Sequence, residues 1–143
     1  MKILVSACLL GCNCRYNGEA LESLDLEGFE VVPVCPEVLG GLPTSRPASE
    51  IVGDRVLSIE GRDVTQAFKD GAKKALDIMD KEAIKVALLK ESSPSCGANF
   101  IYDGSFSGKK IGGAGIFARL LTERGLEVFS ENQLDQLKAR KNE

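Results

Sequence analysis

Three short apolar runs in this chain each lead into a segment that carries a cysteine. The runs are residues 2–6, 31–34 and 84–89, and the cysteines that follow them are Cys8, Cys35 and Cys96. Apolar runs of this length, bounded by glycine and proline, are typical of buried strands. In an open parallel sheet, the carboxyl ends of the strands form the edge where ligands bind. We therefore expect the three thiols to meet at one edge of a parallel sheet.

The third run leads into residues 90–97, which read Lys-Glu-Ser-Ser-Pro-Ser-Cys-Gly. Pro94 and Gly97 prevent the strand from continuing and favour a tight turn. Three serines and one cysteine lie in that turn. Small polar residues in such a turn leave donors pointing into a crevice. This segment is the main candidate for a functional loop.

The rest of the chain alternates helical and strand-like segments. In the first half we expect a short helix over 19–27, an irregular path over 33–43, a loop over 44–51 and a strand over 55–59. A helix with Thr65 as its N-cap and a hairpin over 100–106 should follow. A further helix should follow the glycines of 112–115, and a strand over 126–129 should lead to Ser130, which caps a last helix. This alternation predicts an α/β fold. We expect residues 1–143 to form one domain, with a mainly parallel sheet flanked by helices in a Rossmann-like layering.

The sequence contains no histidine. Ser-His-Asp and Cys-His catalytic groups are therefore excluded, and a metal would have to be held by thiolates and carboxylates. Soft thiolates favour zinc or an iron–sulfur cluster. Three thiolates could hold a tetrahedral zinc with one position left for water, or a [4Fe–4S] cluster with one iron left for substrate. Spacing alone leaves both open, together with the simpler interpretation that the three cysteines are small buried hydrophobes.

Net charge and hydropathy bound the partners of the protein. The formal net charge is −3, and no tract is rich in lysine and arginine. Because proteins that bind phosphate backbones carry a basic footprint, a small-molecule substrate is favoured over a nucleic acid. No run approaches the roughly 18 apolar residues of a membrane span, and no secretory signal is visible. We expect a cytoplasmic protein whose five cysteines are not in structural disulfides.

Two further patterns suggest other chemistry. The glycines of 113–115, with Ala118 and an acid at Glu131, superficially fit a dinucleotide-binding fingerprint. A helix amino terminus that offers N–H groups to an anion would explain the same glycines. Alternatively, Cys96 could be a nucleophile activated by such a helix terminus or by Lys90.

The sequence also contains a set of longer motifs. These are Ser-Ala-Cys-Leu-Leu-Gly at 6–11, Arg-Tyr-Asn-Gly at 15–18, Val-Cys-Pro-Glu-Val-Leu-Gly-Gly-Leu-Pro at 34–43, Gly-Arg-Asp-Val-Thr at 61–65, the segment 90–97 and Phe-Ser-Glu at 129–131. Together, and in this order, they resemble the thiouracil desulfidase-like family, which was long catalogued as a domain of unknown function. The resemblance spans essentially the whole chain.

The resemblance implies an enzyme with a [4Fe–4S] cluster held by Cys8, Cys35 and Cys96. Its open iron would bind the sulfur of a thiolated pyrimidine such as 2-thiouracil, and sulfide would leave without net redox change. Glu37 would deprotonate water, and Ser93 or Ser95 would relay a proton. A zinc or cluster-binding module without turnover is the competing hypothesis.

The resemblance leaves the substrate and the full ligand set open. The substrate could be a free thiolated base, a nucleoside or a thiolated tRNA. Cys12 or Cys14 could supply a fourth ligand, because both lie near Cys8 in the sequence.

Overall fold

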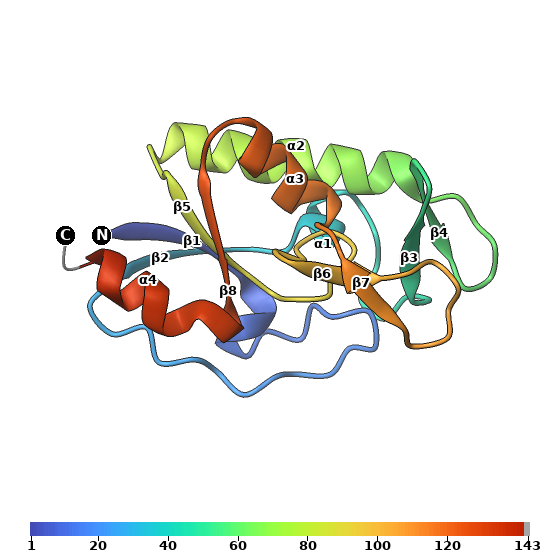
Figure 1. Ribbon diagram of the computed structural model, residues 1–143, viewed down its shortest axis with the longest axis horizontal. Helices are drawn as coiled ribbons and strands as arrows, with labels where there is room; N and C mark the ends of the chain where they lie inside the picture. Colours follow the sequence, from blue (N-terminus) through green and yellow to red (C-terminus); the bar gives the residue numbers. More distant parts are fainter. Residues whose placement is uncertain (142–143) are drawn as a thin grey trace.

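A four-stranded parallel sheet forms the centre of the computed structural model, which describes residues 1–141 (Figure 1). The strand order is β2-β1-β5-β8, and every neighbouring pair is parallel. The strands are β1 (Lys2–Ser6), β2 (Glu30–Val34), β5 (Val86–Leu89) and β8 (Glu127–Ser130). The predicted α/β fold with a mainly parallel sheet is confirmed. The three strands that lead to the cysteines, β2, β1 and β5, are direct neighbours.

Helices cover both faces of this sheet (Figure 1). Successive side chains of a strand point to opposite faces, so Leu4 packs in one apolar cluster while Ile3 and Val5 pack in another. The first cluster includes side chains of α2 (Thr65–Lys81) and α3 (Ile116–Glu123). The second includes Leu137 of α4 (Leu134–Lys141). The sheet is therefore the middle layer of three, and none of the helices in residues 1–141 has the length and apolar character needed to cross a membrane.

Two antiparallel hairpins lie beyond the carboxyl edge of the sheet (Figure 1). They are formed by β3 (Ser49–Val52) with β4 (Arg55–Ser58) and by β6 (Phe100–Tyr102) with β7 (Lys110–Gly112). Glu50 links them, because its carboxylate accepts hydrogen bonds from the backbone N–H groups of Gly104 and Phe106. The hairpin predicted over 100–106 is confirmed, although its second strand begins later, and part of the loop predicted over 44–51 is strand β3.

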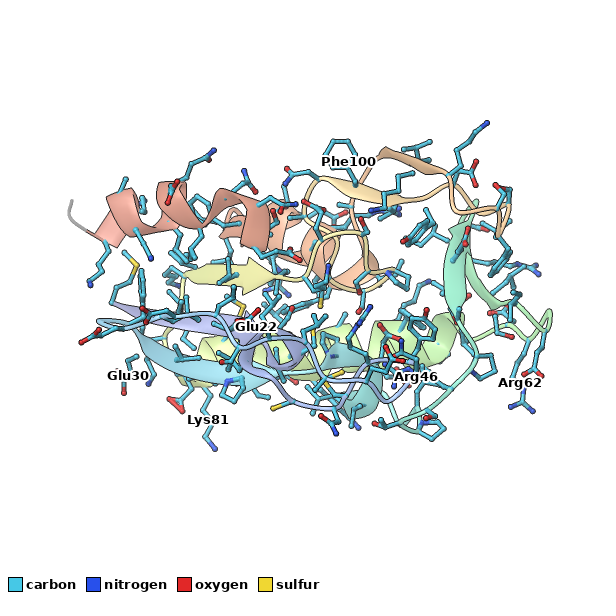
Figure 2. The ribbon with its side chains drawn as sticks, turned by 90° about the horizontal axis from the view of Figure 1, so that it is seen from below. Glu22, Glu30, Arg46, Arg62, Lys81 and Phe100 are labelled. Atoms are coloured by element: carbon cyan, nitrogen blue, oxygen red, sulfur yellow. The ribbon has the colours of Figure 1, made fainter. Side chains whose placement is uncertain are left out.

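The segment over 19–27 is not the predicted helix but an irregular coil. Leu21 and Leu24 are partly buried against the second apolar cluster, and the Leu24 N–H donates to the Leu9 carbonyl oxygen at 2.9 Å. This packing, together with the hydrogen bond to a distant segment of the same chain, overrides the local helix preference. Figure 2 views the molecule from this side, with the coil around Glu22 in front of the strands. Leu9 belongs to η1 (Ala7–Leu10), a 3-10 helix that directly follows β1.

Two other local predictions were wrong in detail. The region over 33–43 is not wholly irregular, because α1 (Pro36–Leu39) begins there with proline at its first position, where the missing N–H costs no hydrogen bond. The N-cap of α2 is Val64 rather than Thr65. The Thr65 hydroxyl instead accepts a hydrogen bond from the Val56 N–H of β4, at 2.8 Å.

The chain after α3 follows the prediction more closely. Ser130 and Gln133 form a capping box on the 3-10 helix η2 (Glu131–Gln133), which continues into α4. In this capping box both side chains accept hydrogen bonds from backbone N–H groups: Ser130 Oγ from Asn132 and Gln133 Oε1 from Ser130. The predicted capping role of Ser130 is confirmed.

Helices α1 and α2 contact each other through two glycines. A Cβ added to Gly71 would lie 1.8 Å from the carbonyl oxygen of Pro36, and one added to Gly40 would lie 2.0 Å from that of Ala67. Both glycines are needed because the two backbones touch. This contact fixes α1 and, with it, the position of Glu37.

We predict that Gly71→Ala destabilises the protein, although alanine stabilises an ordinary helix interior by about 1 kcal/mol over glycine. The new methyl group must push α1 away, and overpacking of this kind costs about 1–3 kcal/mol. The free energy of unfolding, measured by urea titration, should fall. Lys73→Ala, on the exposed face of the same helix, should leave it nearly unchanged. A more stable Gly71→Ala variant would contradict the contact between the two helices.

Candidate functional site

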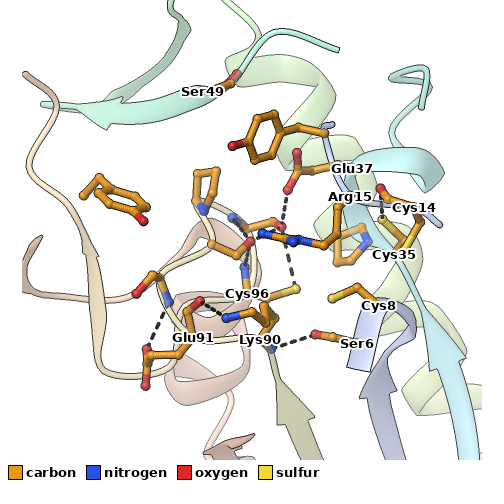
Figure 3. Close-up of a pocket in the computed structure, with 18 of the residues that line it drawn as sticks. Ser6, Cys8, Cys14, Arg15, Cys35, Glu37, Ser49, Lys90, Glu91 and Cys96 are labelled. Carbon is orange, nitrogen blue, oxygen red and sulfur yellow. Dashed lines mark hydrogen bonds between the residues drawn. The ribbon is translucent and has the colours of Figure 1, made fainter. Parts of the chain in front are cut away.

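A pocket of about 370 Å³ lies at the carboxyl edge of the sheet (Figure 3). Segments that follow β1, β2 and β5 line it, together with residues of both hairpins. This is the edge at which open parallel sheets bind ligands. The volume lies near the lower end of the roughly 300–1,000 Å³ range of ligand pockets, which suits a small molecule.

Cys8, Cys35 and Cys96 all line this pocket. Cys8 lies in η1, Cys35 is the N-cap of α1, and Cys96 lies in the loop after β5. Figure 3 shows their side chains around the same space. Three thiols distant in sequence therefore line one pocket at the predicted edge of the sheet, and their role as ligands stays a prediction.

The other two cysteines differ from each other in position. Cys14 also lines the pocket, and its carbonyl oxygen accepts a hydrogen bond from the Cys35 thiol at 3.7 Å. Cys12 is exposed and is not among the lining residues. Of these two residues, only Cys14 is placed to act on the pocket.

The environments of the three thiols give them different acidities. Burial raises the pKa of Cys96 to about 12, against opposing hydrogen bonds from Ser6 and Ser95. Burial also raises the pKa of Cys8 to about 11, with a smaller contribution from nearby Cys35. In contrast, a hydrogen bond with the Cys14 side chain lowers the pKa of Cys35 to about 6, against the effect of burial. Cys35 is therefore the thiol that ionises most readily without a metal.

The hypothesis that Cys96 is an activated nucleophile is wrong. Its thiol is buried and has a raised pKa, whereas a reactive cysteine needs a lowered one. The amino terminus of α3 does not act on it either, because the backbone N–H groups of Ile116 and Phe117 donate to the carbonyl oxygens of Pro94 and Ser95. These bonds hold the loop in place.

The dinucleotide-binding interpretation is also wrong. The strand before the glycines is β7, which pairs antiparallel with β6 and lies outside the parallel sheet. The glycine at 115 is explained by close contact, because a Cβ there would lie 2.5 Å from the Ser95 carbonyl carbon. Glu131 instead accepts a hydrogen bond from the Glu91 N–H at 2.7 Å and forms an ion pair with Lys90.

The hydroxyls of the two candidate serines are hydrogen-bonded to each other at 3.0 Å, but their other partners differ. The Ser95 hydroxyl donates to Glu37 Oε2 at 2.9 Å and also contacts Cys96 Sγ at 3.6 Å. The Ser93 hydroxyl accepts the backbone N–H groups of Ser95 and Cys96, at 3.2 and 3.1 Å. Ser95 thus joins the carboxylate to the thiol, whereas Ser93 closes the turn that carries both residues.

Arg46 fixes the carboxylate of Glu37 and was not singled out from the sequence. Its Nε donates to Glu37 Oε1 at 3.1 Å, and its other nitrogens donate to the carbonyl oxygens of Pro43 and Cys14. The Arg46 and Glu37 side chains are only 5% and 13% exposed. No local pattern could have identified Arg46, because the segment that carries it is irregular and its partners lie on other segments.

The donor set of the pocket fits a [4Fe–4S] cluster better than a single zinc ion. Within residues 1–141, no three cysteine, aspartate or glutamate side chains lie close enough together to hold one metal ion. A tetrahedral zinc with Zn–S distances of about 2.3 Å needs thiolates about 3.8 Å apart. The irons of a cluster each take their own thiolate, so the ligands surround it at wider spacing. Cys8, Cys35 and Cys96 line one pocket without forming a site for a single ion, and this arrangement suits the larger group.

Comparisons with known proteins agree with this arrangement. The family model described as 2-thiouracil desulfurase matches residues 3–133. The "uncharacterized protein YbbK" of Bacillus subtilis (strain 168) is 42% identical, over 94% of this chain and 99% of that protein. The solved structure of the [4Fe-4S]-dependent thiouracil desulfidase TudS superimposes with a TM-score of 0.93 at 44% identity, covering 97% of this chain and 96% of that one.

We predict that Cys35 is the most reactive of the pocket cysteines in metal-free protein. A thiolate forms as the pH rises through the pKa, so alkylation of Cys35 should increase around pH 6, whereas Cys8 and Cys96 should stay unreactive to at least about pH 9. Mass spectrometry of iodoacetamide-treated protein would measure this. Cys14→Ala, which removes the side-chain donor, should move the Cys35 transition to higher pH. A Cys35 profile that this substitution leaves unchanged would contradict the assigned hydrogen bond.

Proposed function

This chain belongs to the 2-thiouracil desulfurase family, and we propose that it replaces the sulfur of a thiolated pyrimidine with oxygen from water. The thiocarbonyl C=S bond breaks, a C=O bond forms, and sulfide leaves with the protons of the water. Carbon, oxygen and sulfur keep their total oxidation level, so no electron donor or acceptor is consumed. The main support is that Cys8, Cys35 and Cys96 line one pocket in a chain that is 44% identical to a [4Fe-4S]-dependent thiouracil desulfidase.

Cys8, Cys35 and Cys96 would hold the [4Fe–4S] cluster as thiolates. When bound, the cluster supplies an iron without a protein ligand, a soft Lewis acid suited to the sulfur of a thiocarbonyl. Burial raises the pKa of the Cys8 and Cys96 thiols, so both are protonated in the metal-free protein. Both must lose their protons to become ligands. Cys14 would act through its hydrogen bond to Cys35 rather than as a fourth ligand.

Glu37 would accept a proton from the attacking water. Its carboxylate lines the pocket, in the same turn of chain as Cys35. Arg46 holds one carboxylate oxygen at 3.1 Å and Ser95 holds the other at 2.9 Å. Both oxygens are therefore oriented before substrate arrives, and such preorganisation lowers the cost of reaching the transition state.

Ser95 would relay the proton between Glu37 and the reacting group. Its hydroxyl is bonded to Glu37 and lies beside Cys96, so it is one hydrogen bond from both the base and a cluster ligand. Ser93 would have a positioning role, because its oxygen accepts two backbone N–H groups. Of the two serines left open by the sequence, the hydrogen bonds favour Ser95.

The proposal is tested by anaerobic reconstitution of the protein with iron and sulfide, followed by incubation with 2-thiouracil. Uracil and sulfide should form in equal amounts, as measured by chromatography and sulfide assay. We predict that Cys8→Ala, Cys35→Ala and Cys96→Ala each lose the brown absorbance and this activity, whereas Cys12→Ala keeps both. A reconstituted protein that binds the cluster but releases no sulfide would support the binding module instead.

We predict that Glu37→Gln and Ser95→Ala keep the cluster but lower kcat by at least about 100-fold, a typical loss when an acid–base group is removed. Ser93→Ala should reduce kcat much less and should lower the thermal stability of the protein, because two backbone N–H groups lose their acceptor. Steady-state rates and iron content of the three variants would check this. Equal loss of kcat in Ser93→Ala and Ser95→Ala would remove the distinction between the serines.

A further inference from the structure

Lys90 lies at the end of β5, and its side chain lines the pocket beside the cysteines (Figure 3). Its backbone N–H donates to the Ser6 hydroxyl at 2.9 Å, which ties it to the end of β1. The side chain is 26% exposed, so the ammonium is partly removed from water. Cys8 is near enough for the charge of Lys90 to lower its pKa, against the larger effect of burial.

The ammonium of Lys90 is held by two acceptors. Glu131 Oε2 lies 2.7 Å from Nζ, and the Glu91 carbonyl oxygen accepts from Nζ at 3.1 Å. The other Glu131 oxygen accepts the Glu91 N–H at 2.7 Å, which fixes the carboxylate itself. A lysine ammonium has three N–H donors. Two have partners here, and no residue within 1–141 accepts the third.

The other cations of the pocket are arranged differently. Arg46 gives its donors to Glu37 and to two carbonyl oxygens. Lys110 is exposed and lies over the Tyr102 ring at 5.6 Å from its centroid. Among the described residues, no hydrogen bond fixes the guanidinium of Arg15. Lys90 therefore combines a fixed position with a free donor at the pocket.

We propose that Lys90 determines substrate specificity by donating this third hydrogen bond to a ring carbonyl oxygen of the thiolated pyrimidine. The inference rests on the proposed function and narrows its substrate class to thiopyrimidines that carry a carbonyl group besides the thiocarbonyl. A partly desolvated ammonium leaves an unpaired donor when the ligand has no acceptor, and such sites reject the analogue strongly. Lys90 would thus select the ring and orient it, with Glu131 as the residue that positions the ammonium.

The test compares two substrates that differ by this carbonyl. 2-Thiouracil carries a carbonyl group besides its thiocarbonyl, and pyrimidine-2-thione lacks it. In the reconstituted wild-type protein, kcat/KM should favour 2-thiouracil. Lys90→Met should lower kcat/KM for 2-thiouracil by about 10- to 100-fold, the range expected for a hydrogen bond from a charged donor. For pyrimidine-2-thione the same variant should change kcat/KM by less than about 3-fold.

Lys85→Met provides a matched control. Lys85 directly precedes β5, at the opposite end from Lys90, and is exposed. Lys85→Met removes one positive charge from the same segment and should leave the preference between the two substrates unchanged. Iron and sulfide analysis of each variant must show equal cluster content. If Lys90→Met does not hold the cluster, Lys90→Gln replaces it, since the amide keeps a shorter neutral donor and should lose the preference in part.

A binding measurement tests the same contact without turnover. Uracil keeps the carbonyl pair, whereas 2-hydroxypyrimidine lacks the second carbonyl. Anaerobic equilibrium dialysis should show that Lys90→Met weakens uracil binding by about 10-fold or more, with little effect on 2-hydroxypyrimidine.

The outcomes separate this inference from the proposed function. Equal losses for both substrates in Lys90→Met, or no loss for either, would overturn the role of Lys90 while the desulfuration itself stands. A reconstituted wild-type protein that releases sulfide from neither compound would overturn the proposed function, and the inference with it.

Discussion

The parallel pairing of β2, β1 and β5 is the constraint on which the site depends. Parallel strands bring their carboxyl ends to one edge, and each of these strands is followed by a segment that carries one of the pocket cysteines. Strand β5 lies in the middle of the sheet and is fully buried, because its side chains pack into the apolar clusters on both faces. Because this apolar core positions the backbone, the thiols are brought together without any direct attraction between them.

Polar contacts then fix the side chains that line the pocket. The close backbone contact of α1 with α2 holds Glu37, and Arg46 and Ser95 hold its two oxygens. On the opposite side, Glu131 from the far end of the chain fixes Lys90. Among residues 1–141, no buried side-chain nitrogen or oxygen lacks a hydrogen-bond partner. A side-chain donor that has no partner, such as the third N–H of Lys90, is therefore not fully buried and can reach a ligand in the pocket.

Local pattern predicted the elements whose signal is strong over short range. The strands before Cys8, Cys35 and Cys96 and the apolar stripe of α2 were confirmed, since burial in a regular element leaves a clear periodicity. Failures occurred where distant packing decides. The coil over 19–27 follows the surface of the second apolar cluster, and α1 depends on glycines that fit it against α2. Neither contact is visible in a local window.

The sequence by itself determined which functional groups this protein has at its strand ends: thiols, a carboxylate beside one of them, hydroxyls in one turn and no histidine. It also determined the family. Only the tertiary structure decided which groups touch, because a side chain's partner depends on how segments far apart in the chain fold against each other. Arg46 on Glu37, Ser95 rather than Ser93 on the same carboxylate, and Glu131 on Lys90 are all such contacts.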